Sequence, residues 1–150
     1  MWPSPLPRYH LATMSMALDL HAAASPKYKA RQEPRTEEAH LAKILADTRR
    51  HSLVMFYSSR CNLCKALQAS IAEVEDSEKD WLGVARINTD HEEQWAPEML
   101  HYQVEKVPCL LLLKPSGEAV CKTGPPRSLR HMEDCLGFLL ETGRQNRRAR

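Results

Sequence analysis

A pair of cysteines, Cys61 and Cys64, constrains this chain more than any other feature of its sequence. The pair follows a short apolar run at residues 53–57 and opens an amphipathic stretch, an order typical of a strand that leads into a helix. The first turn of a helix presents unpaired N–H groups and a partial positive charge, and both favour a thiolate at Cys61. Cys64 follows one turn later, within reach of an intramolecular disulfide. The spacing therefore indicates reversible dithiol–disulfide chemistry, in which the thiolate attacks.

Two other interpretations of the pair stay open at this point. A Cys-x-x-Cys can supply half of a zinc site, but tetrahedral zinc needs a second pair of ligands. The remaining cysteines, Cys109, Cys121 and Cys135, are 12 and 14 residues apart and form no such pair, so we expect no metal. The pair could also consist of two buried structural cysteines.

Length and composition indicate one domain with a core of its own, because the chain has 150 residues and 43% of them are hydrophobic. No apolar run reaches the roughly 18 residues of a membrane-spanning helix. The five cysteines are an odd number, which argues against a disulfide framework and for a reducing intracellular compartment. An organelle (plastid or mitochondrion) and the cytoplasm both fit this expectation.

The charges divide the chain into three parts. Residues 1–35 hold five basic and two acidic residues, and residues 143–150 hold four arginines and no acid. The domain between them, residues 36–142, therefore carries net negative charge, unlike a nucleic-acid-binding domain. We interpret the proline-rich residues 1–35 as a disordered or transit-like extension, and residues 143–150 as a basic C-terminal tail.

Apolar periodicity predicts eight helices and strands within this domain. Thr36 is expected to cap the first helix, which runs to about residue 50. The others are strands at 53–57, 84–88, 110–113 and 118–122, and helices at 61–74, 91–102 and from residue 129. Strands that alternate with helices predict parallel pairing, and the last two strands predict a hairpin. The expected fold class is α/β, with a small mixed central sheet flanked by helices.

Several of these segments, in this order, resemble the thioredoxin family over about residues 41–140. Residues 54–57 followed by Cys61-Asn62-Leu63-Cys64-Lys65 are similar to the family's strand and active-site loop, and residues 85–90 to its next strand. Val107-Pro108 before an apolar strand resembles the cis-proline segment. Gly117-Glu118 and Gly124 match the hairpin turn and the glycine after the last strand. The resemblance implies a thioredoxin-like fold.

The resemblance also implies a thiol–disulfide oxidoreductase that exchanges disulfides with protein substrates. Cys61 would attack a target disulfide, and Cys64 would resolve the mixed disulfide. Val107 and Pro108, with a cis bond between them, would shape the substrate groove beside Arg60. No cofactor is needed, because the electrons reside on the two sulfurs. The implied partners are protein disulfides and a reductant, either a protein or glutathione.

Three departures from the family pattern concern the chemistry of the pair. Arg60 replaces the usual tryptophan before the first cysteine, and it and Lys65 add positive charge that favours the thiolate. We therefore expect a less reducing couple than ordinary thioredoxin. Met55 stands where the family often buries an acid, and Arg86 where it often has a nearby lysine, which predicts that resolution by Cys64 either is slow or uses water.

Cys109, directly after Pro108, is an addition with two possible roles. It could trap a disulfide beside the pair, or it could be an inert core residue, as strand alternation suggests. A second class of function stays open as well, in which the fold is a redox-inactive interaction subunit of a larger assembly. A redox-sensing or metal-relay protein that uses Cys109 with the pair is a third possibility.

Overall fold

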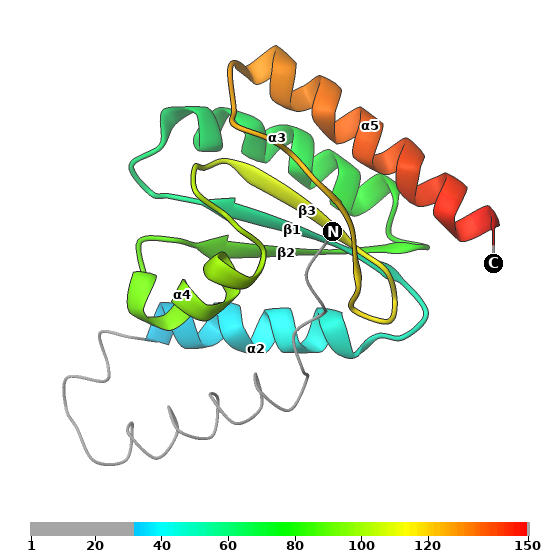
Figure 1. The fold of residues 1–150 in the computed structure, drawn as a ribbon, viewed down its shortest axis with the longest axis horizontal. Helices are drawn as coiled ribbons and strands as arrows, with labels where there is room; N and C mark the ends of the chain where they lie inside the picture. The colour runs from blue at the N-terminus through cyan, green and yellow to red at the C-terminus, as the bar shows by residue number, and fades with distance from the viewer. Residues whose placement is uncertain (1–31, 150) are drawn as a thin grey trace.

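Eight helices and strands form the part of the chain that the computed structural model describes, residues 32–149 (Figure 1). Helices and strands alternate up to α4, as the sequence predicts. Their bounds are α2 Gln32–Ala46, β1 His51–Tyr57, α3 Asn62–Ser77, β2 Leu82–Asn88, α4 Glu92–His101, β3 Cys109–Leu113, β4 Ala119–Lys122 and α5 Leu129–Arg148.

The four strands form one mixed sheet in the order β2-β1-β3-β4. β1 pairs in parallel with β2, with Tyr57 opposite Asn88, and α3 is the crossover between them. β1 pairs antiparallel with β3, and β3 with β4 as a hairpin. This confirms the expected α/β class, with a small mixed sheet flanked by helices. The carboxyl ends of the parallel strands β1 and β2 lie at the same end of the sheet. The cysteine pair follows β1 at this end.

Both faces of the sheet are covered by helices (Figure 1). On one face, Leu53 and Met55 of β1 and alternate leucines of β3 pack against α3 and α5. On the other face, Val54 and Phe56 pack with Trp95 of α4 and Leu41 of α2. Strands buried on both faces show continuous apolar runs instead of alternation, which explains the uninterrupted run at residues 53–56.

The prediction that Thr36 caps the first helix is wrong, because α2 begins at Gln32 and Thr36 lies inside it. The helix also ends at Ala46, before the predicted residue 50. Its end has a local cause. The Asp47 carboxylate accepts hydrogen bonds from the Arg49 backbone N–H and the Arg50 guanidinium, both at 2.9 Å, and this turn leads into β1. Residues 1–31 of the predicted extension lie outside the described residues.

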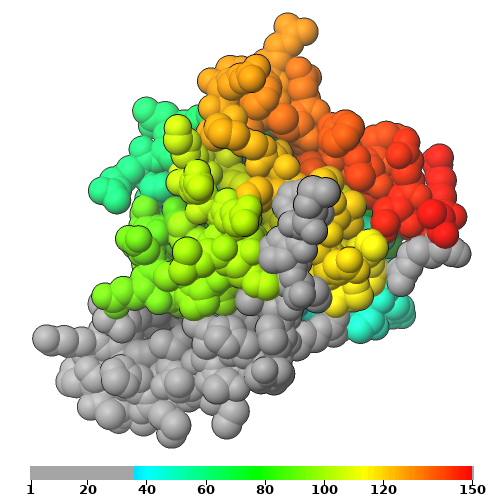
Figure 2. Space-filling view, in the orientation of Figure 1, coloured from blue at the N-terminus to red at the C-terminus, as the bar shows by residue number. Residues whose placement is uncertain are grey.

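The predicted basic tail is helical as far as Arg148, because α5 continues to that residue. Gly143 packs against the Trp81 ring, and the Arg144 guanidinium pairs with the Glu78 carboxylate. The His51 ring is hydrogen-bonded to Asn146 Oδ1 at 2.8 Å. These long-range contacts stabilise the extended end of the helix, and local sequence patterns do not predict them. Figure 2 shows α5, orange to red, as a continuous ridge on this face of the molecule.

None of the described helices combines the length and the apolar character that crossing a bilayer would need.

Candidate active site

Cys61 and Cys64 are joined by a disulfide in the structure, with Cα atoms 5.2 Å apart. Cys61 is the N-cap of α3, with extended backbone angles, and its Sγ accepts a hydrogen bond from the Cys64 backbone N–H at 3.0 Å. An N-cap acceptor is normally an oxygen of Ser, Thr, Asp or Asn. Here the sulfur takes that position, so a thiolate at Cys61 would receive an N–H bond and the positive end of the helix dipole.

The two cysteines differ in their exposure to solvent. Cys61 is half-buried, whereas Cys64 is 1% exposed and belongs to the core cluster beneath α3. A bulky disulfide from another protein can therefore approach Cys61, and Cys64 is reached from Cys61. No acid lies in the first turn of α3, so no carboxylate there opposes a negative charge on Cys61.

The loop before the pair is held by the segment that follows β2. Asp90 accepts hydrogen bonds from the Ser58 hydroxyl at 2.6 Å and the Ser59 backbone N–H at 2.9 Å. The Asn88 side chain donates to the Ser59 hydroxyl at 3.0 Å. The bonds that Ser58 and Ser59 donate to Asp90, with the Ser58 bond the largest contributor, hold the pKa of the Asp90 carboxyl below its ordinary value. Residues at the end of β2 and just after it therefore hold the loop that precedes Cys61.

Val107 lies beside the pair, and the peptide bond between Val107 and Pro108 is cis, as the resemblance implies. The Val107 carbonyl oxygen is 4.0 Å from Cys61 Sγ. Pro108 is buried, and Val107 is half-buried between the two core clusters. The backbone of Val107 is thus close enough to the Cys61 sulfur for one bound segment to contact both.

Met55 is fully buried in the same core cluster as Cys64. Its thioether cannot transfer a proton. Arg86, whose pairing with β1 places it opposite Met55, turns its guanidinium to α3. There it bonds to Gln68 at 3.0 Å and to Glu75 at 3.1 Å. The Arg86 guanidinium is therefore held by hydrogen bonds to side chains of α3.

Arg60 and Lys65 flank the pair in sequence and lie at the surface. The Arg60 side chain is 89% exposed, and its guanidinium lies 3.9 Å from the Asp90 carboxylate. Lys65 is exposed on the first turn of α3. Their predicted effects on the thiolate, and the place of Arg60 in the groove, stay predictions.

Cys109 faces away from the pair, as strand alternation predicts. It is 4% exposed and packs with the cluster on the opposite face of the sheet. Its Sγ lies 3.9 Å from the Thr123 carbonyl oxygen. Burial raises the pKa of the Cys109 thiol, so this residue is a poor nucleophile in the folded protein.

Cys121 and Cys135, the other free cysteines, are half-buried on β4 and α5. Burial raises the pKa of the Cys121 thiol to about 11. Over residues 32–149, no three His, Cys, Asp or Glu side chains gather as a metal site would require.

Sequence reasoning missed the residues that hold the site in place. Asp90 and Asn88 were seen only as part of a strand segment, and Ser58 and Ser59 were given no role. One signal could have found them. Polar residues directly after two parallel neighbouring strands are brought to the same edge of a sheet, where such folds place their functional groups.

Comparisons with known proteins agree with this geometry. The family model described as Thioredoxin matches residues 33–136. The "Thiol:disulfide interchange protein TxlA homolog" of Synechocystis is 27% identical over 145 residues, covering 93% of this chain and 79% of that protein. The "Thiol:disulfide interchange protein TxlA" of Synechococcus elongatus is 29% identical over 82 residues, or 55% of this chain and 42% of that protein.

Among solved structures, the germline-specific thioredoxin Deadhead of Drosophila melanogaster has a TM-score of 0.57 with this chain. The likeness covers 71% of this chain and 91% of that one. The sequence identity is 16%, so the likeness concerns the fold alone.

Proposed function

This chain belongs to the thioredoxin family, whose model covers residues 33–136, and on that premise we propose that Cys61 attacks protein disulfides and Cys64 resolves them. The chain is a thiol–disulfide oxidoreductase, as the family, the two interchange-protein relatives and the cysteine pair together indicate. The observation that supports the division of roles is the difference in access. Cys61 is half-buried at the cap of α3, and Cys64 is buried beneath it.

The reaction begins with the reduced pair. The Cys61 thiolate attacks one sulfur of a target disulfide, the target S–S bond breaks, and the other target sulfur leaves as a thiolate that takes up a proton. The Cys64 thiol then loses its proton and attacks the Cys61 sulfur of the mixed disulfide. The Cys61–Cys64 bond forms, and the second target thiol leaves. Two electrons pass from this chain to the target, and a reductant of the protein or glutathione class restores the pair.

The groove is proposed to form at Val107 and Pro108. An extended target segment that pairs with the Val107 backbone would hold its disulfide next to Cys61, since the Val107 carbonyl oxygen is 4.0 Å from Cys61 Sγ. Main-chain pairing accepts many sequences, because it uses groups that every residue carries. This property suits a protein that acts on several targets.

The proposal is tested by trapping. Cys64→Ser should accumulate mixed disulfides with target proteins on Cys61 in cell extracts, because the resolving thiol is missing. Cys61→Ser is the matched control and should trap nothing, because Cys64 is buried. Equal trapping by the two variants, or no trapping and no thiol-dependent reduction of insulin by the unmodified chain, would overturn the assignment of roles.

The alternative of a redox-inactive interaction subunit gains no specific support, because the pair is joined and Cys61 is accessible. A reducing intracellular compartment remains a prediction from cysteine usage. Fractionation of cells that express the full chain would test it.

A further inference from the structure

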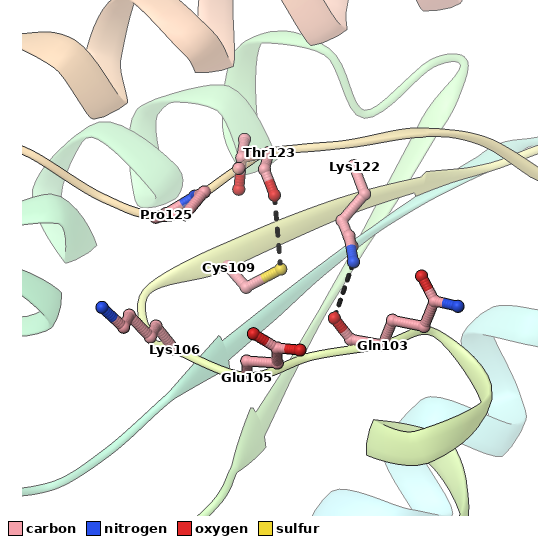
Figure 3. Close-up of a pocket in the computed structure, with 8 residues that line it drawn as sticks. Gln103, Glu105, Lys106, Cys109, Lys122, Thr123 and Pro125 are labelled. Atoms are coloured by element: carbon pink, nitrogen blue, oxygen red, sulfur yellow. Dashed lines mark hydrogen bonds between the residues drawn. The ribbon is translucent and has the colours of Figure 1, made fainter.

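The segment that leads into Val107 borders a hollow of about 330 Å³ (Figure 3). Gln103, Glu105 and Lys106 form one wall, and residues 122–125, which follow from β4, form the other. The buried Cys109 also lines the hollow. Val104 packs into the core cluster on this face of the sheet, whereas Gln103, Glu105 and Lys106 are exposed and border the hollow.

The ammonium group of Lys122 connects the two walls. It donates hydrogen bonds to the Tyr102 carbonyl oxygen at 2.9 Å and to the Gln103 carbonyl oxygen at 2.7 Å. The second of these bonds is the dashed line between Lys122 and Gln103 in Figure 3. Both carbonyls belong to the C-terminal end of α4, where the helix dipole is negative and a cation is favourable.

The backbone held by Lys122 is in an unfavourable conformation. Gln103 has a φ of 56°, in the left-handed region, although it is not a glycine. Such a conformation is unfavourable for an ordinary residue and persists only where neighbouring contacts stabilise it. The Val104 N–H donates to the Met99 carbonyl at 2.8 Å, which ends the helix. The Lys122 bond at Gln103 is therefore placed at the residue where the chain turns from α4 toward Val107.

The opposite wall is held independently of Lys122. The Thr123 hydroxyl accepts a hydrogen bond from the Leu110 N–H at 3.0 Å, and the Thr123 N–H donates to the Leu110 carbonyl at 2.9 Å. β4 and the residue after it are thus attached to β3. Loss of the Lys122 ammonium would leave that wall in place and remove two of the hydrogen bonds that hold the segment before Val107.

We propose that Lys122 is a positioning residue for protein substrates, which holds the segment from Tyr102 to Val107 so that the Val107 backbone is presented beside Cys61. This inference rests on the proposed substrate groove. It applies to targets that pair with the backbone of this segment. A small disulfide reagent needs only the Cys61 thiolate, so its reduction does not depend on Lys122.

The test compares two lysines of the same β3–β4 hairpin in the full-length chain. Lys122→Met removes the ammonium and keeps an unbranched side chain. Lys114→Met is the matched control, since Lys114 pairs with Glu118 at 3.7 Å and bonds to nothing in the substrate segment. Both variants are assayed for reduction of insulin and of the small reagent 5,5′-dithiobis(2-nitrobenzoate), and their melting temperatures are measured.

For Lys122→Met we expect KM for insulin to rise roughly five- to tenfold, because a charge-assisted hydrogen-bond pair is lost. The rate with the small reagent should be unchanged. Lys122→Arg should recover part of the loss, because a guanidinium can donate to both carbonyls. Lys114→Met should resemble the unmodified chain in both assays.

Two results would overturn the inference. One is an unchanged KM for insulin in Lys122→Met. The other is an equal loss with both substrates together with a lower melting temperature, which would show a general structural role. Failure of the proposed function is distinguishable, since the unmodified chain would then not reduce insulin and Cys64→Ser would trap no target.

Discussion

The Asp90 carboxylate accepts a hydrogen bond from the Ser58 hydroxyl at 2.6 Å, although 32 residues separate them in the sequence. The bond joins the loop after β2 to the loop that delivers Cys61 to the cap of α3. Parallel pairing of β1 with β2 makes this possible, because it sets Tyr57 opposite Asn88 and brings the two loops together. The loop that carries Cys61 is therefore held by a carboxylate from another part of the chain.

Removal of this carboxylate should loosen the loop. Asp90→Ala is expected to lower the free energy of unfolding by about 1–2 kcal/mol, the usual loss for hydrogen bonds to a charged group. It should also slow insulin reduction, because Cys61 is held less precisely. Urea unfolding and the insulin assay measure the two effects. Asp134→Ala, at an exposed position of α5, is the control and should change neither.

The same carboxylate predicts a pH dependence of stability. Hydrogen bonds from Ser58 and then Ser59 lower the pKa of Asp90 below its ordinary value of 3.8. A lowered carboxyl pKa stabilises the folded state above the ordinary pKa, and the stabilisation is lost as the pH falls through the folded-state value. Unfolding free energies measured from about pH 6 to pH 2 should therefore fall less steeply for Asp90→Asn. Parallel curves for the two proteins would refute the assignment.

Met55 gives a prediction about the resolving step. Met55→Asp places a carboxyl group under Cys64 and should speed release of a mixed disulfide, because that group can accept the Cys64 proton. It should also cost roughly 2–4 kcal/mol of stability, since the position is fully buried. Stopped-flow measurement of target release tests the first effect. Met55→Asn, equally polar but unable to take a proton, should lose stability without the faster release.

The end of α5 is sensitive to one added methyl group. A Cβ at Gly143 would lie 2.8 Å from two carbons of the Trp81 ring and 3.2 Å from Leu112. Gly143→Ala should thus destabilise the chain by about 1–3 kcal/mol through overpacking. Gly137→Ala, in the same helix with no atom within 4 Å of the new Cβ, should be neutral or stabilising by up to about 1 kcal/mol. Thermal unfolding of the two variants measures the difference. Equal melting temperatures for Gly143→Ala and Gly137→Ala would contradict the packing argument.

The thiols should react in an order set by burial. In the reduced, folded chain at neutral pH, iodoacetamide is expected to modify Cys61 first, since its thiolate is stabilised at the cap of α3. Cys109 and Cys121 should stay unmodified, because burial raises the pKa of both thiols, that of Cys121 to about 11. Peptide mass mapping gives the order. Urea should make both reactive, and modification of Cys109 at the rate of Cys61 in the folded chain would contradict the burial.

Local sequence patterns were sufficient to predict which segments form helices and strands, and to identify the pair Cys61 and Cys64. The run at residues 53–57 predicted β1, and the spacing of Cys61 and Cys64 predicted the start of α3. Strand alternation also predicted that Cys109 faces the core. Each of these depends on residues within a few positions of one another, where the helical and strand periods act directly. The bounds were less accurate, since Thr36 lies inside α2 and α5 runs to Arg148.

The sequence by itself therefore determined the fold class and the two sulfurs. The tertiary structure decided what surrounds them. Asp90 bonds to the loop that precedes Cys61, and the Val107 carbonyl oxygen lies 4.0 Å from the Cys61 sulfur. Lys122 bonds across the hollow to the segment that leads to Val107. The physical reason is range. A helix or strand period relates near neighbours, whereas these contacts join segments separated by about twenty to fifty residues, and only the register of the paired strands and the packing of the helices bring them within bonding distance.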